Sequence, residues 1–265
     1  MSSPKRPLIL AIANQKGGVG KTTTAINVAA ALAARGLATL LIDIDPQGNA
    51  STGLGFDRTQ SFVGTYELLL GDRPPLDAIR STAILNLSLI PADTDLVGAE
   101  IELVEADDRA QRLAKSLAQL PADRFRVVVI DCPPSLGLLN LNGLAAADAV
   151  LVPLQCEFFA LEGISQLMRT IDRVKGGLNP RLRLAGIVLT MYDRRNNLSD
   201  LVADDARSFF GDTVYATPIP RNIRISEAPS HGKPVLTYDP RSAGALAYSQ
   251  LAEELIRREN LIQDL

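Results

Sequence analysis

Glycine, lysine and threonine residues are concentrated in one short segment, in the order that a phosphate-binding turn requires. The segment reads Asn14-Gln-Lys-Gly-Gly-Val-Gly-Lys-Thr-Thr23 and follows an apolar run, Leu8–Ala13. Glycines let backbone N–H groups curl around phosphate oxygens, and a helix that starts just after them adds partial positive charge. On this pattern Lys21 contacts the β- and γ-phosphates of a nucleotide, and the Thr22 hydroxyl is a ligand of Mg²⁺. The predicted phosphate-binding residues also include Gly17, Gly18, Val19, Gly20 and Thr23.

Two further apolar runs lead directly into aspartates. The first continues as Asp43-Ile-Asp45-Pro46, and the second, Arg126–Ile130, is followed by Asp131. Ligands bind at the carboxyl ends of strands in α/β sheets, so these carboxylates are expected near the phosphate turn. Asp131 is predicted to hold Mg²⁺ through water or through Thr22. Alternation along a strand sends Asp43 and Asp45 to the same side, and two roles stay open for Asp43: support of the waters around Mg²⁺, or capping of the adjacent loop.

Short apolar runs alternate with helical patterns along the chain. Continuous apolar runs are typical of strands buried on both faces of a parallel sheet. We predict strands at Leu8–Ala13, Ala38–Ile44, Leu87–Ile90, Arg126–Ile130, Ala149–Pro153, Leu184–Thr190 and Val214–Pro218. We predict helices at Lys21–Arg35, Ser135–Ala147, Glu157–Lys175, Asn197–Phe210 and Ser242–Arg258, with small helices over one edge within residues 54–85. The expected fold is α/β, a mostly parallel twisted sheet with helices on both faces, with residues 1–265 as one domain.

Composition narrows the class of protein. The net charge of −3 means that any nucleic-acid binding must come from a local patch. Two distant cysteines, Cys132 and Cys156, lack metal spacing and suit a reducing cytoplasm, and the lone His231 is expected at the surface. No apolar run approaches the length of about 18 residues that a membrane span needs. The sequence therefore predicts a cytoplasmic protein without a membrane partner.

The phosphate turn departs from the ordinary motif in an informative way. Gln15 stands where the ordinary P-loop has glycine, and Lys16-Gly-Gly-Val-Gly-Lys-Thr22 resembles the deviant Walker A motif of the ParA, MinD and nitrogenase iron-protein group. That resemblance implies a P-loop NTPase of the deviant Walker A type, which forms an ATP-dependent homodimer with two ATP molecules at its centre. It also implies that Lys16 reaches the partner's phosphates and that Asp45 orients the attacking water. The catalytic residues implied are Lys16, Lys21 and Asp45.

Longer motifs are similar to the chromosomal ParA (Soj) branch of this group. They span Ile44–Gly55, Asp131–Leu136, Leu189–Asp193 and Ile219–Gly232. The C-terminal segment carries mixed charges, whereas an interfacial membrane helix of the MinD kind needs an excess of cations on one face. The resemblance places adenine recognition at Pro220 and Asn222, with Met191 nearby. It further implies chromosome partitioning, non-specific binding to double-stranded DNA on the nucleoid, and a ParB-type centromere-binding protein that stimulates hydrolysis.

Positive charge is slightly enriched toward the C-terminal part. Residues 181–241 contain nine Lys/Arg against seven Asp/Glu, while the rest of the chain contains eighteen against twenty-three. We predict that Arg195, Arg224 and Lys233 contact DNA phosphates without reading bases. The alternative is that these side chains are solvated or bind nucleotide and acidic neighbours. Three other functions stay open: a ParA-like ATPase that positions another cargo, a membrane-associated ATPase like MinD, and a metal-cluster or metabolic nucleotide-dependent enzyme on the same fold.

Overall fold

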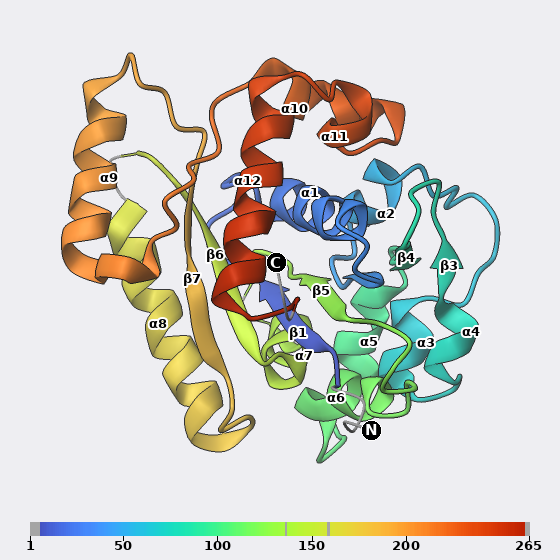
Figure 1. The fold of residues 1–265 in the computed structure, drawn as a ribbon. Coiled ribbons are helices and arrows are strands. Elements are labelled where there is room, and N and C mark those ends of the chain that lie inside the picture. Colours follow the sequence, from blue (N-terminus) through green and yellow to red (C-terminus); the bar gives the residue numbers. More distant parts are fainter. Residues whose placement is uncertain (1–5, 136, 158–159, 263–265) are drawn as a thin grey trace.

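A seven-stranded, mostly parallel sheet runs through the centre of the part of the chain that the structure describes (Figure 1). This computed structural model describes residues 6–135, 137–157 and 160–262. The strand order is β3-β4-β2-β5-β1-β6-β7, and only the β3–β4 pair is antiparallel. The predicted α/β class is therefore confirmed. The strands are β1 Leu8–Ile12, β2 Thr39–Asp43, β3 Arg80–Ser81, β4 Leu87–Ile90, β5 Val127–Asp131, β6 Ala149–Gln155 and β7 Arg183–Thr190.

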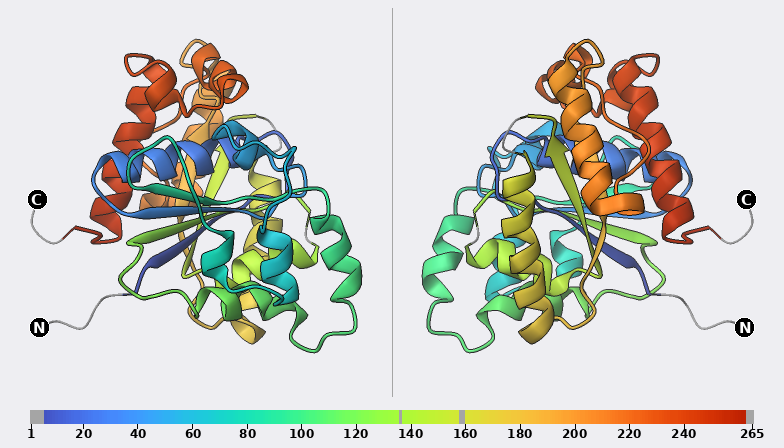
Figure 2. Two further views of the ribbon diagram at one scale, coloured as in Figure 1. Left: turned by 90° about the vertical axis from the view of Figure 1, so that its right-hand side faces the viewer. Right: turned by 90° about the vertical axis from the view of Figure 1, so that its left-hand side faces the viewer.

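Helices cover both faces of the sheet (Figure 2). Along β1, Leu10 and Ile12 enter one apolar core while Ala11 enters the other, because successive side chains point to opposite faces. The first core is closed by α1 Lys21–Ala34, α2 Asn49–Gly53, α10 Ile223–Glu227, α11 Val235–Tyr238 and α12 Ala243–Arg258. The second is closed by α3 Thr65–Leu70, α4 Pro75–Ala78, α5 Leu96–Glu102, α6 Arg112–Leu117, α7 Leu138–Ala146, α8 Ala160–Gly177 and α9 Asn197–Phe210.

Helix ends follow local chemistry. Gly36 adopts a left-handed φ of +80° directly after α1, as expected for a glycine that terminates a helix. Ser242 caps α12 by accepting a hydrogen bond from the Ala245 N–H at 3.2 Å. The predicted helix at Ser135–Ala147 begins later than expected, at Leu138, and α8 is described from Ala160. Leu136 and residues 158–159, which those predictions included, lie outside the described residues. None of the helices described is long and apolar enough to cross a membrane.

The predicted strand at Val214–Pro218 is wrong. Within the described structure the segment makes an isolated parallel bridge, Ile187 with Val214, at the edge of β7. The Tyr215 N–H still donates to the Ile187 carbonyl at 2.8 Å, but the N–H groups of Ala216 and Thr217 donate to the Glu254 carboxylate at 2.9 and 3.2 Å. Pro218 has no N–H to contribute to a ladder. The Glu254 side chain of α12 therefore accepts the backbone hydrogen bonds that a neighbouring strand would accept at this edge.

Candidate functional site

The glycine-rich turn joins the carboxyl end of β1 to the start of α1. Gly18 and Gly20 have φ values of +76° and +87°, in the left-handed region that glycine adopts without strain. Gly20 is the N-cap of α1, and its carbonyl accepts the Thr24 N–H at 2.8 Å. The N–H groups of the turn are thus presented at a helix N-terminus, where the helix dipole favours an anion. The predicted order of strand, turn and helix is confirmed.

Two side chains, Asn14 of the turn segment itself and Thr190 at the end of β7, fix the shape of this turn. The Asn14 Oδ1 atom accepts the Lys16 N–H at 3.0 Å, while its Nδ2 donates to the Pro153 carbonyl at 2.8 Å. The Thr190 hydroxyl donates to the Val19 carbonyl at 2.9 Å. The turn is therefore tied to the ends of β6 and β7, and its geometry is set before any ligand arrives.

Lys21 and Lys16 have different environments. Lys21 is buried, and its Nζ donates to the Lys16 carbonyl at 2.8 Å. Burial lowers the pKa of Lys21, and the nearby Asp131 and Asp45 carboxylates oppose that shift. The Lys16 ammonium forms an ion pair with Glu157, just after β6, and the two side chains are 42% and 34% exposed. Lys16 thus lies at the surface, while Lys21 lies inside the turn.

Two carboxylates meet at the carboxyl ends of adjacent strands. Asp43 on β2 pairs in register with Asp131 on β5, and both are fully buried. Neither carboxylate oxygen of Asp131 has a hydrogen-bond partner among the described residues. Burial, and then the charge of Asp43, raise the pKa of Asp131 well above its ordinary value, while Thr22 and Lys21 partly offset the rise. An unpartnered buried carboxylate beside a threonine hydroxyl fits a hydrated divalent cation.

Asp43 and Asp45 hold the loop that follows β2. Asp43 accepts the N–H and hydroxyl of Ser51, both at 2.8 Å, and the Asp45 N–H at 3.1 Å. Burial raises the pKa of Asp43 to about 6 despite these bonds. Of the two roles left open for Asp43, the contacts match capping of the loop. Asp45 is also buried, and it accepts the Gln47 N–H at 3.0 Å.

A cavity of about 380 Å³ opens beside the phosphate turn. Pro220, Asn222 and Met191 line it together with Gly20 and Thr23 of the turn. The segments predicted to bind adenine and phosphate are therefore adjacent. The Asn222 Oδ1 atom accepts the Arg224 N–H at 2.9 Å and caps α10, so the Nδ2 donor is the group left for a base edge.

Tyr248 also lines this cavity, and the sequence did not predict it. It is contributed by α12, and its hydroxyl lies 3.3 Å from the Thr24 hydroxyl of α1. No local motif marks this tyrosine, since it has the apolar spacing of an ordinary helix core residue. Only the packing of α12 on α1 brings it to the site.

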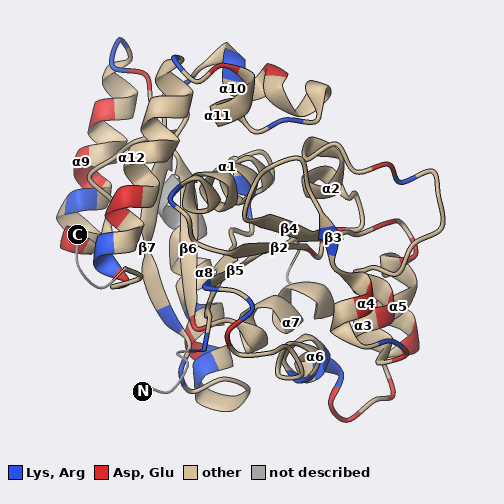
Figure 3. Cartoon of the chain, turned by 45° about the vertical axis from the view of Figure 1, so that its right-hand side comes forward, with Lys and Arg blue, Asp and Glu red and all other residues tan. Residues whose placement is uncertain are grey.

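Of the predicted DNA-binding side chains, Arg195 lies just before α9, Arg224 lies on α10, and Lys233 lies just before α11. Figure 3 shows Lys and Arg positions in the loops and helices around these elements. Two of them have acidic partners: Arg195 forms a two-pronged contact with Asp193 at 3.0 and 2.9 Å, and Arg224 pairs with Glu227 and Asp239 at 2.8 and 3.3 Å. Lys233 is exposed, and no ion pair of it is present among the described residues. These partners match the alternative that acidic neighbours hold the arginines.

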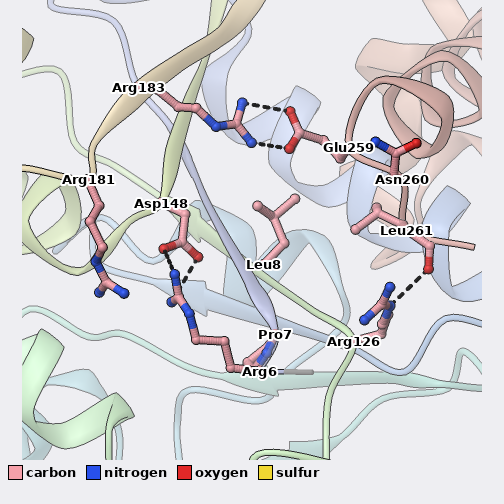
Figure 4. Close-up of a pocket in the computed structure, with 10 residues that line it drawn as sticks. All are labelled: Arg6, Pro7, Leu8, Arg126, Asp148, Arg181, Arg183, Glu259, Asn260 and Leu261. Carbon is pink, nitrogen blue, oxygen red and sulfur yellow. Dashed lines mark hydrogen bonds and ion pairs between the residues drawn. The ribbon is translucent and has the colours of Figure 1, made fainter. Parts of the chain in front are cut away.

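A larger cavity, of about 600 Å³, lies at the amino ends of the strands, opposite the phosphate turn (Figure 4). Arg6 pairs there with Asp148 at 2.7 Å, and Arg183 pairs with Glu259. The Arg126 Nε donates to the Leu261 carbonyl at 2.9 Å. None of the predicted site residues lines this cavity, so it is separate from the phosphate turn.

Comparisons with known proteins agree with the geometry. Residues 8–184 match the AAA domain family. The chain is 61% identical over 252 residues to the chromosome partitioning protein ParA of Caulobacter vibrioides (strain NA1000 / CB15N), covering 95% of this chain and 94% of that protein. It is 51% identical over 247 residues to the sporulation initiation inhibitor protein Soj of Bacillus subtilis (strain 168), covering 93% and 97%. The structure of cobyrinic acid a,c-diamide synthase from Mycobacterium smegmatis with bound ADP and magnesium superposes with a TM-score of 0.84 at 43% identity, covering 96% of each chain.

Proposed function

Because this chain belongs to the ParA/Soj family of chromosome-partitioning ATPases, we propose that it binds ATP with Mg²⁺, dimerises around the nucleotide and hydrolyses it. The observation that carries the proposal is the pairing of a preformed phosphate turn with the unpartnered buried carboxylate of Asp131. Residues 1–265 act as one ATPase domain in this proposal. The backbone of Gly17–Thr23 binds the phosphates, and Lys21 exchanges its contact with the Lys16 carbonyl for the β- and γ-phosphates.

The residues present fit a magnesium ion. Mg²⁺ keeps several waters and is bound through one or two carboxylates together with substrate phosphates. Thr22 would hold it directly and Asp131 through water. No group of three or more His, Cys, Asp or Glu side chains that could hold a metal ion occurs in the described residues. When bound, the ion neutralises phosphate charge. Asp45, close enough to Lys21 for their charges to interact, orients the attacking water.

Lys16 supplies the cation that crosses the dimer interface. Two triphosphates that face each other repel, and a lysine from the partner offsets that repulsion. The present partner of Lys16 is Glu157, and because both side chains are partly exposed this ion pair contributes at most about 1 kcal/mol. Lys16 can therefore give up Glu157 for a phosphate at small cost.

The output of the ATP dimer is non-specific binding to double-stranded DNA. DNA phosphates are contacted by Arg195, Arg224 and Lys233. A dimer carries two copies of each side chain, so it makes twice as many phosphate contacts as a monomer. Hydrolysis, stimulated by a ParB-type centromere-binding protein, separates the subunits and releases DNA. The protein is then cytoplasmic and associated with the nucleoid.

Light scattering with Lys16→Ala tests this function. In ATP and Mg²⁺ the parent should double in mass, whereas Lys16→Ala should bind ATP as a monomer and lose hydrolysis. Lys115→Ala, which removes a surface lysine on α6, is the matched control and should dimerise normally. A Lys16→Ala protein that dimerises and hydrolyses ATP like the parent would falsify the proposed role of Lys16.

A metabolic enzyme is the second candidate, because one similar structure carries the name of a diamide synthase at 43% identity. Its distinguishing property is a small-molecule product other than ADP and phosphate. A relative named as a partitioning protein is 61% identical over nearly the same length, which favours partitioning. A ParA-like ATPase that positions another cargo would share every step above except the partner.

A further inference from the structure

An arginine from a later part of the chain holds the Asp45 loop, residues 44–48 between β2 and α2. Arg58 lies eleven residues beyond Gln47, and its Nη1 atom donates to the Gln47 carbonyl. Its Nη2 atom lies 3.5 Å from the Pro46 carbonyl oxygen. The planar fork of one guanidinium thus reaches two successive carbonyls of one loop, an arrangement that the compact ammonium of lysine does not match.

Gly48 leaves the space that this contact needs. A Cβ atom at Gly48 would lie 2.4 Å from both the Cζ and the Nη1 atoms of Arg58, so any larger residue would displace the guanidinium. The Gly48 N–H donates to the Asp45 carbonyl at 2.8 Å, which closes the turn of the loop. The arginine therefore lies directly against the backbone of this turn.

Gln47 connects Arg58 to the carboxylate of Asp45. The Gln47 N–H donates to the Asp45 Oδ1 atom at 3.0 Å, and the Gln47 carbonyl accepts the hydrogen bond from Arg58. Asp43 holds the loop at its start, where its Oδ1 atom accepts the Asp45 N–H at 3.1 Å. A displacement of the Gln47 backbone would therefore turn the Asp45 carboxylate, and small displacements of a group that orients a reactant lower reaction rates strongly.

Within the described residues, both hydrogen bonds of the Arg58 side chain are made with the backbone of the Asp45 loop. The Nε atom is buried without a hydrogen-bond partner there. The charge of Arg58 acts on Asp93, but the two side chains form no hydrogen bond or ion pair in the described structure. A charged donor makes a stronger hydrogen bond to a carbonyl than a neutral donor does, so Arg58 is suited to holding this loop.

We propose that Arg58 is a positioning residue for Asp45, which keeps the Asp45 loop in the geometry where the carboxylate orients the attacking water. The inference rests on the proposed function of Asp45 and adds a residue that acts through it. Arg58 then affects the hydrolysis step and not the binding of ATP, because the phosphates are bound by Lys21 and the glycine-rich turn. The expected signature is a lower kcat with unchanged ATP affinity.

Steady-state hydrolysis and calorimetry with ATP and Mg²⁺ test this signature. Arg58→Gln should lower kcat about tenfold and change ATP affinity less than about twofold. Arg58→Lys should restore little of the rate, because it keeps the charge without the fork. Arg80→Gln is the matched control, since Arg80 also donates to backbone carbonyls, those of Asp77 and Val63 at 2.6 and 3.2 Å. It should hydrolyse ATP at the parental rate.

A double variant and a measurement without nucleotide separate positioning from a general loss of structure. Adding Arg58→Gln to Asp45→Ala should not lower the residual hydrolysis further, because the group that Arg58 positions is already absent. In the nucleotide-free protein, hydrogen exchange at the Gly48 N–H should become about tenfold faster in Arg58→Gln and stay unchanged in Arg80→Gln.

Four results would each overturn the proposal: an unchanged kcat in Arg58→Gln, an equal loss in Arg80→Gln, a further tenfold loss in the Asp45→Ala background, or unchanged exchange at Gly48 in Arg58→Gln. A parent that hydrolyses no ATP, or an Asp45→Ala protein as active as the parent, would instead refute the proposed function. In that case faster exchange at Gly48 would still show that Arg58 holds the loop, and unchanged exchange would show that it does not.

Discussion

At the amino ends of β1, β6 and β7 each carboxylate faces a guanidinium, whereas at the carboxyl ends of β2 and β5 two buried carboxylates face each other. Figure 4 shows the first arrangement, in which Arg6 meets Asp148 and Arg183 meets Glu259. In the second, Asp131 has no hydrogen-bond partner among the described residues and lies in register with Asp43. Lys21, whose charge acts on Asp131, donates its hydrogen bond to the Lys16 carbonyl.

The two regions therefore differ in whether the charged side chains are paired within the protein. A buried charge without a partner destabilises the folded chain, because desolvation is not offset. Such a group persists where its binding partner comes from outside the protein. The charges at the amino ends are paired within the protein, whereas in the proposed function the carboxylate at the carboxyl ends is matched by a cation bound with phosphate. Substitutions at the carboxyl ends should therefore change nucleotide affinity, whereas substitutions at the amino ends should change stability and leave nucleotide affinity unchanged.

The largest expected effect is on nucleotide affinity. Lys21→Ala should weaken ATP binding about 100-fold, because a charge-assisted contact to phosphate is lost, while the free energy of unfolding changes by less than about 1 kcal/mol. Calorimetry with ATP and urea denaturation measure the two quantities. Arg183→Gln, at the amino edge, is the contrasting variant and should lower stability by about 1 kcal/mol with unchanged ATP affinity. Equal ATP binding by the Lys21→Ala and parent proteins would refute this prediction.

Removing a carboxylate charge should change the free energy of unfolding in opposite directions at the two ends of the strands. Asp131→Asn should raise the free energy of unfolding of the nucleotide-free protein by about 1 to 3 kcal/mol, because an unpaired buried charge is removed. Asp148→Asn should lower it by about 1 kcal/mol, because Arg6 and the Ile9 N–H lose their charged acceptor. Urea denaturation without Mg²⁺ compares the two matched variants. Destabilisation by both substitutions would mean that the two edges do not differ in this respect.

The increase in the free energy of unfolding that we expect for Asp131→Asn should depend on pH. The pKa of Asp131 is raised in the folded protein, chiefly by burial, so the folded state takes up this proton at a higher pH than the unfolded chain does. As the pH falls from neutral toward the ordinary pKa of a carboxyl, the parent carboxyl becomes neutral in the folded state and its penalty disappears. The stability difference between variant and parent should therefore shrink as the pH falls. A difference that stays constant or grows over this range would contradict the raised pKa.

The smallest effect is expected for arginines that already have carboxylate partners. Arg224→Ala should lower the log–log salt slope of DNA binding by the ATP dimer by less than about 1 unit, because Glu227 and Asp239 compete for the guanidinium. Lys233→Ala should lower it by about 1 to 2 units, one contact per subunit. Filter binding on two unrelated duplexes across a salt series measures both slopes. A larger change for Arg224 than for Lys233 would show that DNA displaces the acidic partners.

Local patterns in the sequence were sufficient for the elements of the nucleotide site. The turn at Lys16–Thr22, the strands that end at Asp43 and Asp131, and the helix ended by Gly36 are each encoded by neighbouring residues, through glycine conformation, apolar runs and helix termination. The α/β class follows from the same short-range patterns. Helices α5 and α6 were missed because their apolar positions are few and interrupted by charged turns.

Tertiary structure alone decided which groups meet across the chain. The register of β2 with β5 brings Asp43 beside Asp131, the packing of α12 brings Tyr248 to the cavity, and the Glu254 carboxylate displaces a strand at Val214–Pro218. The Arg224–Asp239 ion pair also joins distant residues, whereas the Arg195–Asp193 and Arg224–Glu227 pairs are local. Residue types and spacing determine local conformation, whereas desolvation and charge pairing depend on distances that only the assembled fold defines.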